Sequence, residues 1–197
     1  MTFVLGLTGS IGMGKSTTAK LFEEAGVAVW DADAAVHKLY APGGKASLAL
    51  QSVFPDVLAA DGAVNRDALR ALIAKDPSVL DRVNALVHPL VAQDRAEFLA
   101  RHTDVVVLDV PLLYETGLDK ACDKVVVVST DAKTQEDRVL SRGTMTRKDF
   151  ETILSRQMPD AEKRARADYL ILTKTLEQAR ADVHKILTEI WGQIHDA

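Results

Sequence analysis

The sequence predicts an α/β protein with a parallel β-sheet whose two faces are covered by helices. Short apolar runs rich in β-branched residues recur along the chain, and helical hydrophobic patterns separate them. A glycine-rich segment also connects the first apolar run to the first helical pattern, which is the arrangement of a strand–loop–helix unit. The length of 197 residues is sufficient for one full domain and too short for three.

The strands and helices follow from the spacing of apolar residues. Four β-branched runs and a weaker fifth one predict strands over residues 3–8, 27–30, 105–110, 125–129 and 169–173. Helical periodicity predicts helices over residues 15–25, 34–40, 45–54, 66–74, 77–86, 89–101, 131–142, 147–157 and 176–191. Because strands alternate with helices, the connections are expected to be crossovers between parallel strands.

The alternation is uneven, and this predicts the organisation of the chain. Almost all of the stretch between the second and third strands reads as helix, and residues 138–168 form a second strand-free segment rich in Arg and Lys. We therefore predict one domain over residues 1–197 with two helical excursions. Its parts are a core of residues 1–35, 102–134 and 167–197, a helical substrate-binding region over residues 36–101, and a lid over residues 135–166.

Composition excludes several classes of function. The 24 Lys and Arg residues against 28 Asp and Glu give a net charge of -4, whereas proteins that neutralise many nucleic-acid phosphates carry a basic excess. The single Cys122 excludes an internal disulfide and a Cys-rich zinc site, and it is expected to be a buried, inert thiol. Without a signal-peptide pattern or a membrane-length apolar run, we expect a cytoplasmic protein that binds neither nucleic acid nor membrane.

The strongest motif lies between the first strand and the first helix. It reads Gly9-Ser10-Ile11-Gly12-Met13-Gly14-Lys15-Ser16-Thr17 and matches the phosphate-loop pattern G-x-x-x-x-G-K-[ST]. The glycines let successive backbone N–H groups turn toward a polyphosphate, and the start of the helix adds its dipole. Lys15 is expected to reach the β- and γ-phosphates of ATP, and the Ser16 hydroxyl is expected to bind Mg²⁺. The sequence thus predicts a nucleoside-triphosphate site.

Carboxylates follow two other predicted strands. Asp31 and Asp33 come directly after the second strand, where one of them can orient an acceptor hydroxyl or support Mg²⁺ through water. For Asp31 the alternative is a simple cap on the helix that follows it. Asp109 ends the third strand, as in the Walker-B pattern, in which the carboxylate contacts Mg²⁺ or its water shell.

Basic residues of the second excursion predict a lid. Gln135, Arg138 and Arg142 share one helical face, and a mobile lid with guanidinium groups would stabilise charge on a transferring phosphoryl group. For Arg138 and Arg142 we favour this role over a solvated basic face. A solvated face is expected for the later basic residues, which are Arg147, Arg156, Lys163, Arg164 and Arg166.

Further segments accompany the phosphate loop in a fixed order along the chain. They are Leu7-Thr8, Asp31-Ala32-Asp33, His88-Pro89-Leu90-Val91, Asp109-Val110-Pro111-Leu112-Leu113-Tyr114-Glu115, Gln135-x-x-Arg138 with Arg142, Arg156-Gln157, and Ala167-Asp168-Tyr169. In this combination the chain resembles the dephospho-CoA kinase family from Thr8 to about Leu172. The Asp-Val-Pro-Leu-Leu-Tyr-Glu stretch and the Asp-Ala-Asp segment are more discriminating than the phosphate loop, which many nucleotide-binding families share.

The resemblance implies an ATP-dependent transferase that phosphorylates the ribose 3′-hydroxyl of dephospho-CoA, the last step of CoA biosynthesis. It also implies a P-loop core like that of the nucleoside-monophosphate kinases, with a five-stranded parallel sheet, a helical CoA-binding region and a lid. The family's proposed base matches Asp33, and its lid arginines match Arg138 and Arg142. Thr173-Lys174-Thr175 stands where the family has an Asn-containing turn near the adenine.

Three other functions remain as alternatives. Another small-molecule kinase, acting on a nucleoside, a nucleotide or a sugar acid, would differ in the helical segment after Val36, whose substrate the sequence does not reveal. A nucleotide-switched regulatory protein would carry an Asn-Lys-x-Asp motif, which this chain lacks. A degenerate, non-catalytic homologue is disfavoured because Lys15, Ser16, Asp33 and Asp109 are all present.

Overall fold

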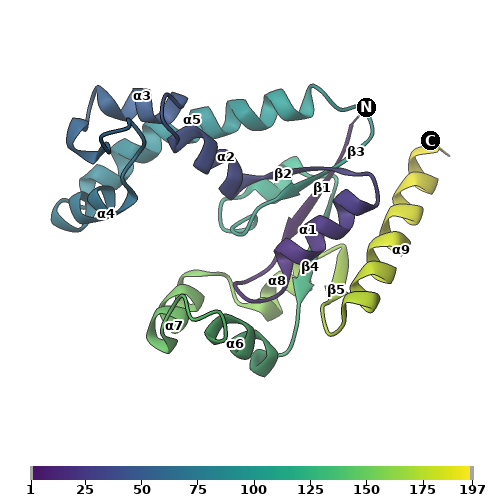
Figure 1. Ribbon diagram of the computed structural model, residues 1–197. Helices are drawn as coiled ribbons and strands as arrows, with labels where there is room; N and C mark the ends of the chain where they lie inside the picture. The colour runs from purple at the N-terminus through teal and green to yellow at the C-terminus, as the bar shows by residue number, and fades with distance from the viewer. Residues whose placement is uncertain (1, 196–197) are drawn as a thin grey trace. The chain divides into compact units, whose positions relative to one another are not determined.

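Five strands form one parallel sheet in the computed structural model, which describes residues 2–195 (Figure 1). Across the sheet the strands follow the order β2-β3-β1-β4-β5. In chain order they are β1 (Phe3–Thr8), β2 (Ala28–Asp31), β3 (Val105–Asp109), β4 (Lys124–Ser129) and β5 (Tyr169–Leu172). The five predicted strands and the predicted fold class are therefore confirmed.

The register of the central strands determines where their carboxyl ends meet. β1 lies between β3 and β4, and its Leu7 pairs with Asp109 of β3. The backbone N–H of Val110, just past β3, donates to the Leu7 carbonyl at 3.0 Å. On the other side of β1, Thr8 pairs with Val127 of β4. The segments that follow β1 and β3 therefore start side by side at one edge of the sheet.

Two helices, α1 (Lys15–Glu24) and α9 (Leu176–His195), pack against each other, and α9 also packs on β5 (Figure 1). Both are amphipathic, because most of their buried residues are apolar and recur at helical spacing. With one face of the sheet they enclose the main core, whose members include Leu5, Leu7, Phe22, Val107, Val126, Ile171, Val183 and Leu187. Burying each such side chain stabilises the fold by about 1.5–3 kcal/mol.

Three shorter helices occupy the chain between β4 and β5. They are α6 (Ala132–Leu140), α7 (Arg147–Arg156) and α8 (Asp160–Arg166). The first two confirm predicted helices, and α7 begins with a capping box in which Thr146 and Asp149 bond each other's backbone N–H groups. The helix α8 was not predicted, because this short segment is rich in charge and lacks the apolar period of a longer helix.

The chain folds into two compact units. Within the described residues, one comprises residues 2–30 together with residues 102–195, and thus contains the sheet core and residues 135–166. The other is Asp31–Arg101, a helical unit that includes all of the segment from Val36 to Arg101. Its elements are α2 (Ala32–Tyr40), α3 (Lys45–Gln51), a 3₁₀ turn at Pro55–Val57, α4 (Arg66–Lys75) and α5 (Ser78–Leu99).

The helical unit has its own core and one feature that differs from the sequence prediction. Its core is formed by apolar residues of all its helices, including Leu39, Leu50, Phe54, Leu69, Val83 and Val87. Two helices were predicted over residues 77–86 and 89–101, but α5 runs without a break through Pro89. The prediction of a helix start at His88-Pro89 is therefore wrong. The buried face formed by Val79, Val83 and Val87 continues up to the proline, so packing outweighs the lost backbone hydrogen bond.

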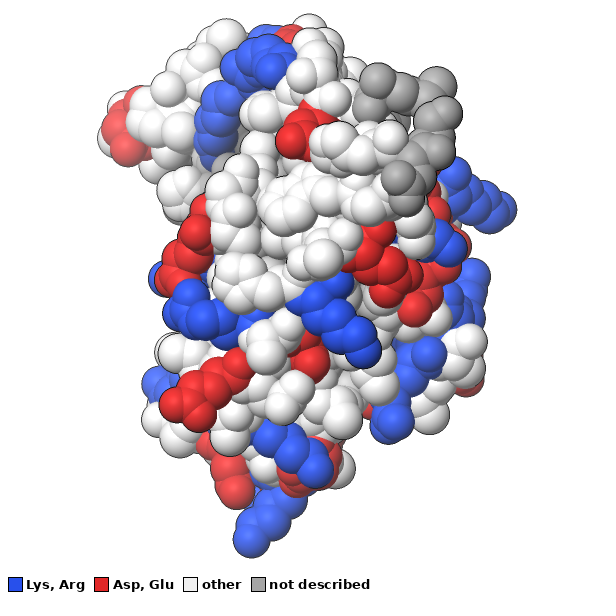
Figure 2. Space-filling model, turned by 90° about the vertical axis from the view of Figure 1, so that its right-hand side faces the viewer, with Lys and Arg blue, Asp and Glu red and all other residues white. Residues whose placement is uncertain are grey.

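The outer surface bears charges of both signs. On the face shown in Figure 2, acidic and basic side chains are interspersed rather than separated into single-sign areas. This distribution agrees with the small net charge of -4. Within residues 2–195, no helix combines the length and the apolar character that crossing a bilayer requires.

Gly6, in the middle of β1, is required by the close approach of a later segment. A Cβ atom at this position would lie 2.8 Å from Leu113 Cδ2 and 2.9 Å from Cys122 Sγ. Cys122 itself is half-buried, not buried as predicted, and its thiol faces the Leu118 carbonyl at 3.6 Å. The segment from Leu113 to Cys122 therefore packs directly on the backbone of the central strand.

We predict that Gly6→Ala lowers the free energy of unfolding by about 1–3 kcal/mol, because Leu113 and Cys122 must move to admit the methyl group. Gly192→Ala, in α9 with no atom within 4 Å of the added Cβ, is the matched control. It should stabilise the protein by up to about 1 kcal/mol, since Ala is the better helix former. Chemical denaturation of both variants tests this prediction. An unchanged free energy of unfolding in Gly6→Ala would contradict the close packing of Leu113 and Cys122 on β1.

Candidate active site

The phosphate loop has the backbone geometry that the motif requires. It connects the end of β1 at Thr8 to the start of α1 at Lys15, and Gly12 and Gly14 have φ values of 80° and 92°. Such values are unfavourable for residues with a side chain, which explains the glycines. Gly14 occupies the N-cap position of α1 and offers no side chain to its first N–H groups. Those groups are therefore suited to bind an anion.

Lys15 and Asp109 form an ion pair at the centre of this site. Lys15 Nζ contacts Asp109 Oδ1, and the two side chains are only 14% and 2% exposed. The sheet register accounts for the contact, because Asp109 ends β3 opposite Leu7, two residues before the loop begins. A carboxylate so deeply buried needs a cationic partner, which Lys15 provides. The structure thus brings together the lysine and the Walker-B carboxylate that the sequence singled out.

Two of the predicted site residues have the chemistry of magnesium ligands. The predicted ligands, the Ser16 hydroxyl and the Asp109 carboxylate, are both oxygen donors, and Ser16 follows Lys15 directly in α1. Mg²⁺ is usually held by one or two protein oxygens and completes its shell with phosphate oxygens and water. Among residues 2–195 there is no cluster of three or more His, Cys, Asp or Glu side chains that could hold a metal by itself. The donor chemistry of Ser16 and Asp109 is compatible with such a cation.

The two aspartates after β2 differ in their surroundings. Asp31 Oδ1 accepts hydrogen bonds from the backbone N–H groups of Asp33 at 2.7 Å and of Ala34 at 3.0 Å. Asp31 is thus the N-cap of α2, which was the alternative role predicted for this residue. Asp33 lies in the first turn of α2 with its side chain exposed. Its carboxylate is free of the capping role that occupies Asp31.

Arg138 and Arg142 line a pocket at the end of the phosphate loop. The cavity measures about 320 Å³, and its wall contains Gly14, Thr17, Thr18, Arg138, Arg142, Thr173, Lys174, Thr175, Leu176 and Ala179. Arg138 lies in α6, which starts at its N-cap Asp131, and Arg142 follows just after the end of that helix. Hydrogen bonds from Thr134 hold the pKa of the Asp131 carboxyl below its ordinary value. The predicted lid arginines, the loop and the turn after β5 therefore meet at one cavity.

Thr173 connects the parts of this pocket. Its hydroxyl accepts from Arg138 Nη1 at 2.9 Å and donates to the Met13 carbonyl at 2.7 Å. Arg138 Nη2 donates to the Thr173 carbonyl as well. Gly14 also packs tightly against it, since a Cβ there would lie 3.0 Å from Thr173 Oγ1. The threonine that stands at the family's Asn-containing turn is therefore buried and bonded to the phosphate loop.

The later basic residues include one clear exception to the predicted solvated face. The prediction is wrong for Lys163, whose side chain is 0% exposed and pairs with Glu115 at 2.9 Å. Lys163 Nζ also donates to the Pro111 carbonyl at 3.1 Å. Arg147 pairs with Glu136 while remaining largely exposed. A basic residue in a charge-rich helix gives no sequence signal that distinguishes burial from exposure.

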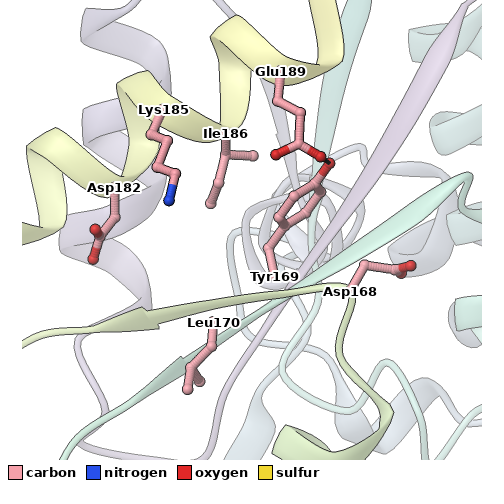
Figure 3. Close-up of a pocket in the computed structure, with 7 residues that line it drawn as sticks. All are labelled: Asp168, Tyr169, Leu170, Asp182, Lys185, Ile186 and Glu189. Atoms are coloured by element: carbon pink, nitrogen blue, oxygen red, sulfur yellow. Dashed lines mark hydrogen bonds between the residues drawn. The ribbon is translucent and has the colours of Figure 1, made fainter. Parts of the chain in front are cut away.

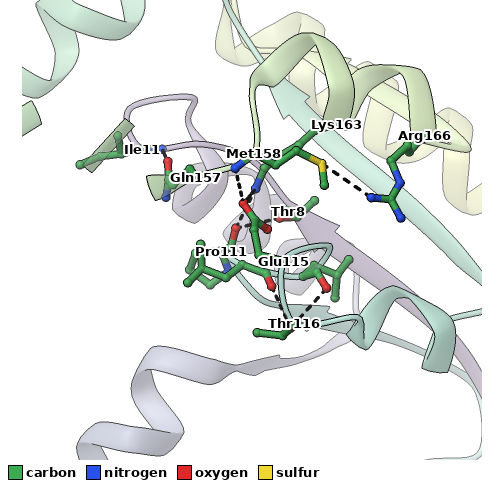
Figure 4. A network of polar contacts seen from close by, with 11 residues as sticks. Thr8, Ile11, Pro111, Glu115, Thr116, Gln157, Met158, Lys163 and Arg166 are labelled. Carbon is green, nitrogen blue, oxygen red and sulfur yellow. Dashed lines mark hydrogen bonds and ion pairs between the residues drawn. The ribbon is translucent and has the colours of Figure 1, made fainter. Parts of the chain in front are cut away.

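Glu115 belongs to a polar network that sequence reasoning missed (Figure 4). Besides pairing with Lys163, Glu115 Oε1 accepts the backbone N–H of Met158 at 2.8 Å. Burial acts to raise the pKa of Glu115, but the hydrogen bonds from Lys163 and Met158 outweigh it, and the pKa is lowered. The Asp109–Glu115 stretch was the signal available in the sequence, although it did not reveal the partners.

A second cavity, of about 230 Å³, lies between β5 and α9 (Figure 3). Tyr169 donates to Glu189 at 2.9 Å, and burial, followed by this hydrogen bond, raises the pKa of the Tyr169 hydroxyl to about 12. Asp168 accepts from Lys124 Nζ and from the Val125 N–H, both at 2.9 Å, and so joins β4 to β5. Since Tyr169 begins β5, this cavity is at the amino end of the strand, whereas ligands of parallel sheets bind at the carboxyl ends.

The sheet, the phosphate loop and the Lys15–Asp109 pair define a P-loop protein of the nucleotide-dependent phosphotransferase class. A sequence model of dephospho-CoA kinase matches residues 3–178, and the chain belongs to the dephospho-CoA kinase family.

Known proteins agree with this assignment. The chain is 54% identical to a dephospho-CoA kinase of Ruegeria pomeroyi, with 99% of this chain and 100% of the relative covered. It is 58% identical to a dephospho-CoA kinase of Cereibacter sphaeroides, with 95% of each chain covered. Among solved structures, TT1252 from Thermus thermophilus matches with a TM-score of 0.84 and 30% identity over 96% of this chain and 98% of that chain.

We predict that Glu115→Gln lowers the free energy of unfolding by about 1.5–3 kcal/mol, the range for a hydrogen bond to a charged group, because the fully buried Lys163 loses its partly exposed anionic partner. Since the pKa of Glu115 is lowered in the folded state, its carboxylate stabilises the protein above the ordinary value of 4.5, and this contribution is lost as the pH falls through the folded-state pKa.

Denaturation curves of wild type and Glu115→Gln should therefore differ at neutral pH and converge in acid, below the lowered folded-state pKa of Glu115. Glu24→Gln serves as the control, because its pair with Arg180 is exposed, at 45% for the arginine and 54% for the glutamate, and should contribute less than about 1 kcal/mol. If both variants lost a similarly small free energy of unfolding, the ion pair between Glu115 and the buried Lys163 would not stabilise the fold as proposed.

Proposed function

We propose that this protein transfers the terminal phosphoryl group of ATP to the ribose 3′-hydroxyl of dephospho-CoA, giving CoA and ADP as the last step of CoA biosynthesis. Membership of the dephospho-CoA kinase family supports this acceptor and ATP as donor. The observation that carries the proposal is the phosphate loop, in which positive-φ glycines and the start of α1 lie next to Lys15 and Asp109. We expect the reaction in the cytoplasm, on small-molecule substrates.

In this proposal the loop from Gly9 to Thr17 binds the triphosphate through backbone N–H groups other than that of Ile11, which donates to Gln157, and Lys15 neutralises the β- and γ-phosphates. Ser16 and Asp109 would hold Mg²⁺, which supplies further neutralisation of phosphate charge when it is bound. The pocket of about 320 Å³ beside Gly14, whose wall includes Arg138 and Arg142, would take part of the bound nucleotide.

The transfer forms a bond between the 3′-oxygen and the γ-phosphorus and breaks the bond from that phosphorus to the β–γ bridging oxygen. Asp33 orients the 3′-hydroxyl by accepting its hydrogen bond and takes its proton as the new bond forms. Orientation of the hydroxyl and acceptance of its proton both contribute to the rate. The helical region over residues 36–101 binds dephospho-CoA, and Arg138 and Arg142 of the lid over residues 135–166 stabilise the charge of the transferring group.

Release of ADP from ATP and Mg²⁺ across a panel of acceptors tests the proposed reaction. The panel contains dephospho-CoA, adenosine, AMP and gluconate. We expect turnover with dephospho-CoA and at most slow turnover with the other three. Lys15→Ala should abolish turnover, which excludes a contaminating kinase. Preference for adenosine, AMP or gluconate would replace the proposed acceptor with that of another small-molecule kinase.

We predict that Asp33→Asn reduces kcat by at least about 100-fold, the typical contribution of a positioned general base, while the affinity for ATP is retained. Asp31→Asn is a close control. Its carboxylate acts as the N-cap of α2, and Asn caps a helix about as well as Asp. Steady-state kinetics of the two variants with dephospho-CoA should separate their roles. A near-normal kcat for Asp33→Asn would remove Asp33 from the mechanism.

A further inference from the structure

Two glutamine side chains hold one residue of the phosphate loop from both sides. Gln157 Oε1 accepts the backbone N–H of Ile11 at 3.1 Å, and Gln135 Nε2 donates to the Ile11 carbonyl at 2.8 Å. These glutamines are 146 and 124 residues away from Ile11 in the sequence. Gln135 lies in α6 and Gln157 is the C-cap of α7, so both belong to the segment predicted as the lid.

The loop is also packed against α6 at the next residue. A Cβ atom on Gly12 would lie 2.6 Å from Val139 Cγ2 and 2.8 Å from the Gln135 carbonyl oxygen. Gln135 is itself buried, with 6% of its surface exposed. The left-handed conformation at Gly12, with φ of 80°, is thus formed in direct contact with the helix that carries Gln135.

Gln157 is fixed in turn by the network of Glu115 and Lys163 (Figure 4). The residue after it, Met158, donates its N–H to Glu115 at 2.8 Å, and Glu115 pairs with the buried Lys163. Lys163 bonds the Pro111 carbonyl, which also accepts from the Thr8 hydroxyl at 3.1 Å.

Thr8 directly precedes the loop. The contacts therefore form a closed ring that leaves the loop at Thr8 and returns to it at Ile11. Every link of this ring lies within the unit that contains the sheet.

We infer that Gln135 and Gln157 are positioning residues, which hold Ile11 and thereby keep the first half of the phosphate loop in the conformation that binds a polyphosphate. The backbone of a loop segment between two glycines can adopt many alternative conformations. Fixing the N–H and carbonyl of Ile11 removes most of these conformations before the nucleotide arrives. Their effect should accordingly fall on nucleotide affinity and not on the acceptor. This inference rests on the proposed function only in that the loop binds ATP and ADP.

The test is the dissociation constant of ADP, measured by calorimetry on the full chain. Gln135→Ala and Gln157→Ala should each raise it about threefold to tenfold, the effect expected for one net hydrogen bond. The double variant should raise it by less than the product of the two, because losing one contact already releases Ile11. The KM for dephospho-CoA and the unfolding temperature should stay close to the wild-type values.

Isosteric variants test the direction of each hydrogen bond. Gln157→Glu can still accept from the Ile11 N–H, whereas Gln135→Glu can no longer donate to the Ile11 carbonyl. Both add the same charge next to the same residue, so Gln135→Glu should bind ADP more weakly than Gln157→Glu. Gln193→Ala, on an exposed part of α9 where the side chain bonds Glu189, is the control that should leave ADP binding unchanged.

Unchanged ADP affinity in both alanine variants would overturn the inference. So would a general loss of stability in which the KM values of ATP and dephospho-CoA rise together, since that result indicates a merely structural role. If wild-type protein binds no ADP, the proposed function fails instead, so the two failures are distinguishable.

Discussion

The ion pair between Lys15 and Asp109 is the contact around which the site is arranged. It depends on the register of β1 and β3, which puts Asp109 opposite Leu7 and next to the start of the loop. Removing this carboxylate from water is costly, and the ammonium group offsets the cost only because the two atoms touch. A slip of one residue in the register would turn Asp109 to the other face of the sheet and separate the pair.

The loop itself is held by groups that are remote in the sequence. Gly12 and Gly14 adopt the positive φ angles of the loop. Neither could carry a side chain without a shift, because α6 lies against Gly12 and Thr173 lies against Gly14. The carbonyl of Met13 is bonded by Thr173, and Ile11 is bonded by the two glutamines. The phosphate loop is therefore preorganised by its surroundings, which is the condition under which backbone dipoles bind anions well.

Much of the fold could be predicted, because it is encoded in local patterns. Apolar β-branched runs indicated the five strands, and the strand–loop–helix pattern located the phosphate loop and Lys15. The packing of side chains was harder to predict from the sequence. The helix α5 passes through Pro89 because its buried valines face a common core, and that core depends on residues far along the chain.

The polar partners of the site were the hardest part to predict. Lys163 is one of several basic residues in a charged segment, and only its pairing with Glu115 and Pro111 shows why it is buried. Gln135 and Gln157 were recognised as parts of family motifs, yet their common partner is a backbone group of Ile11, which leaves no trace in a single sequence. Asp31 was the opposite case, because an aspartate just before a helix already indicates an N-cap.

The central claim is that the loop between β1 and α1 binds the polyphosphate of a nucleotide. Calorimetric titration of the wild-type protein with ADP, AMP and adenosine tests it most directly, because the three ligands differ only in their phosphates. We expect the affinity to fall steeply when the β-phosphate is removed and again when the last phosphate is removed. Equal affinity for ADP and adenosine would show that the protein recognises only the base and sugar, and that the loop does not bind the polyphosphate.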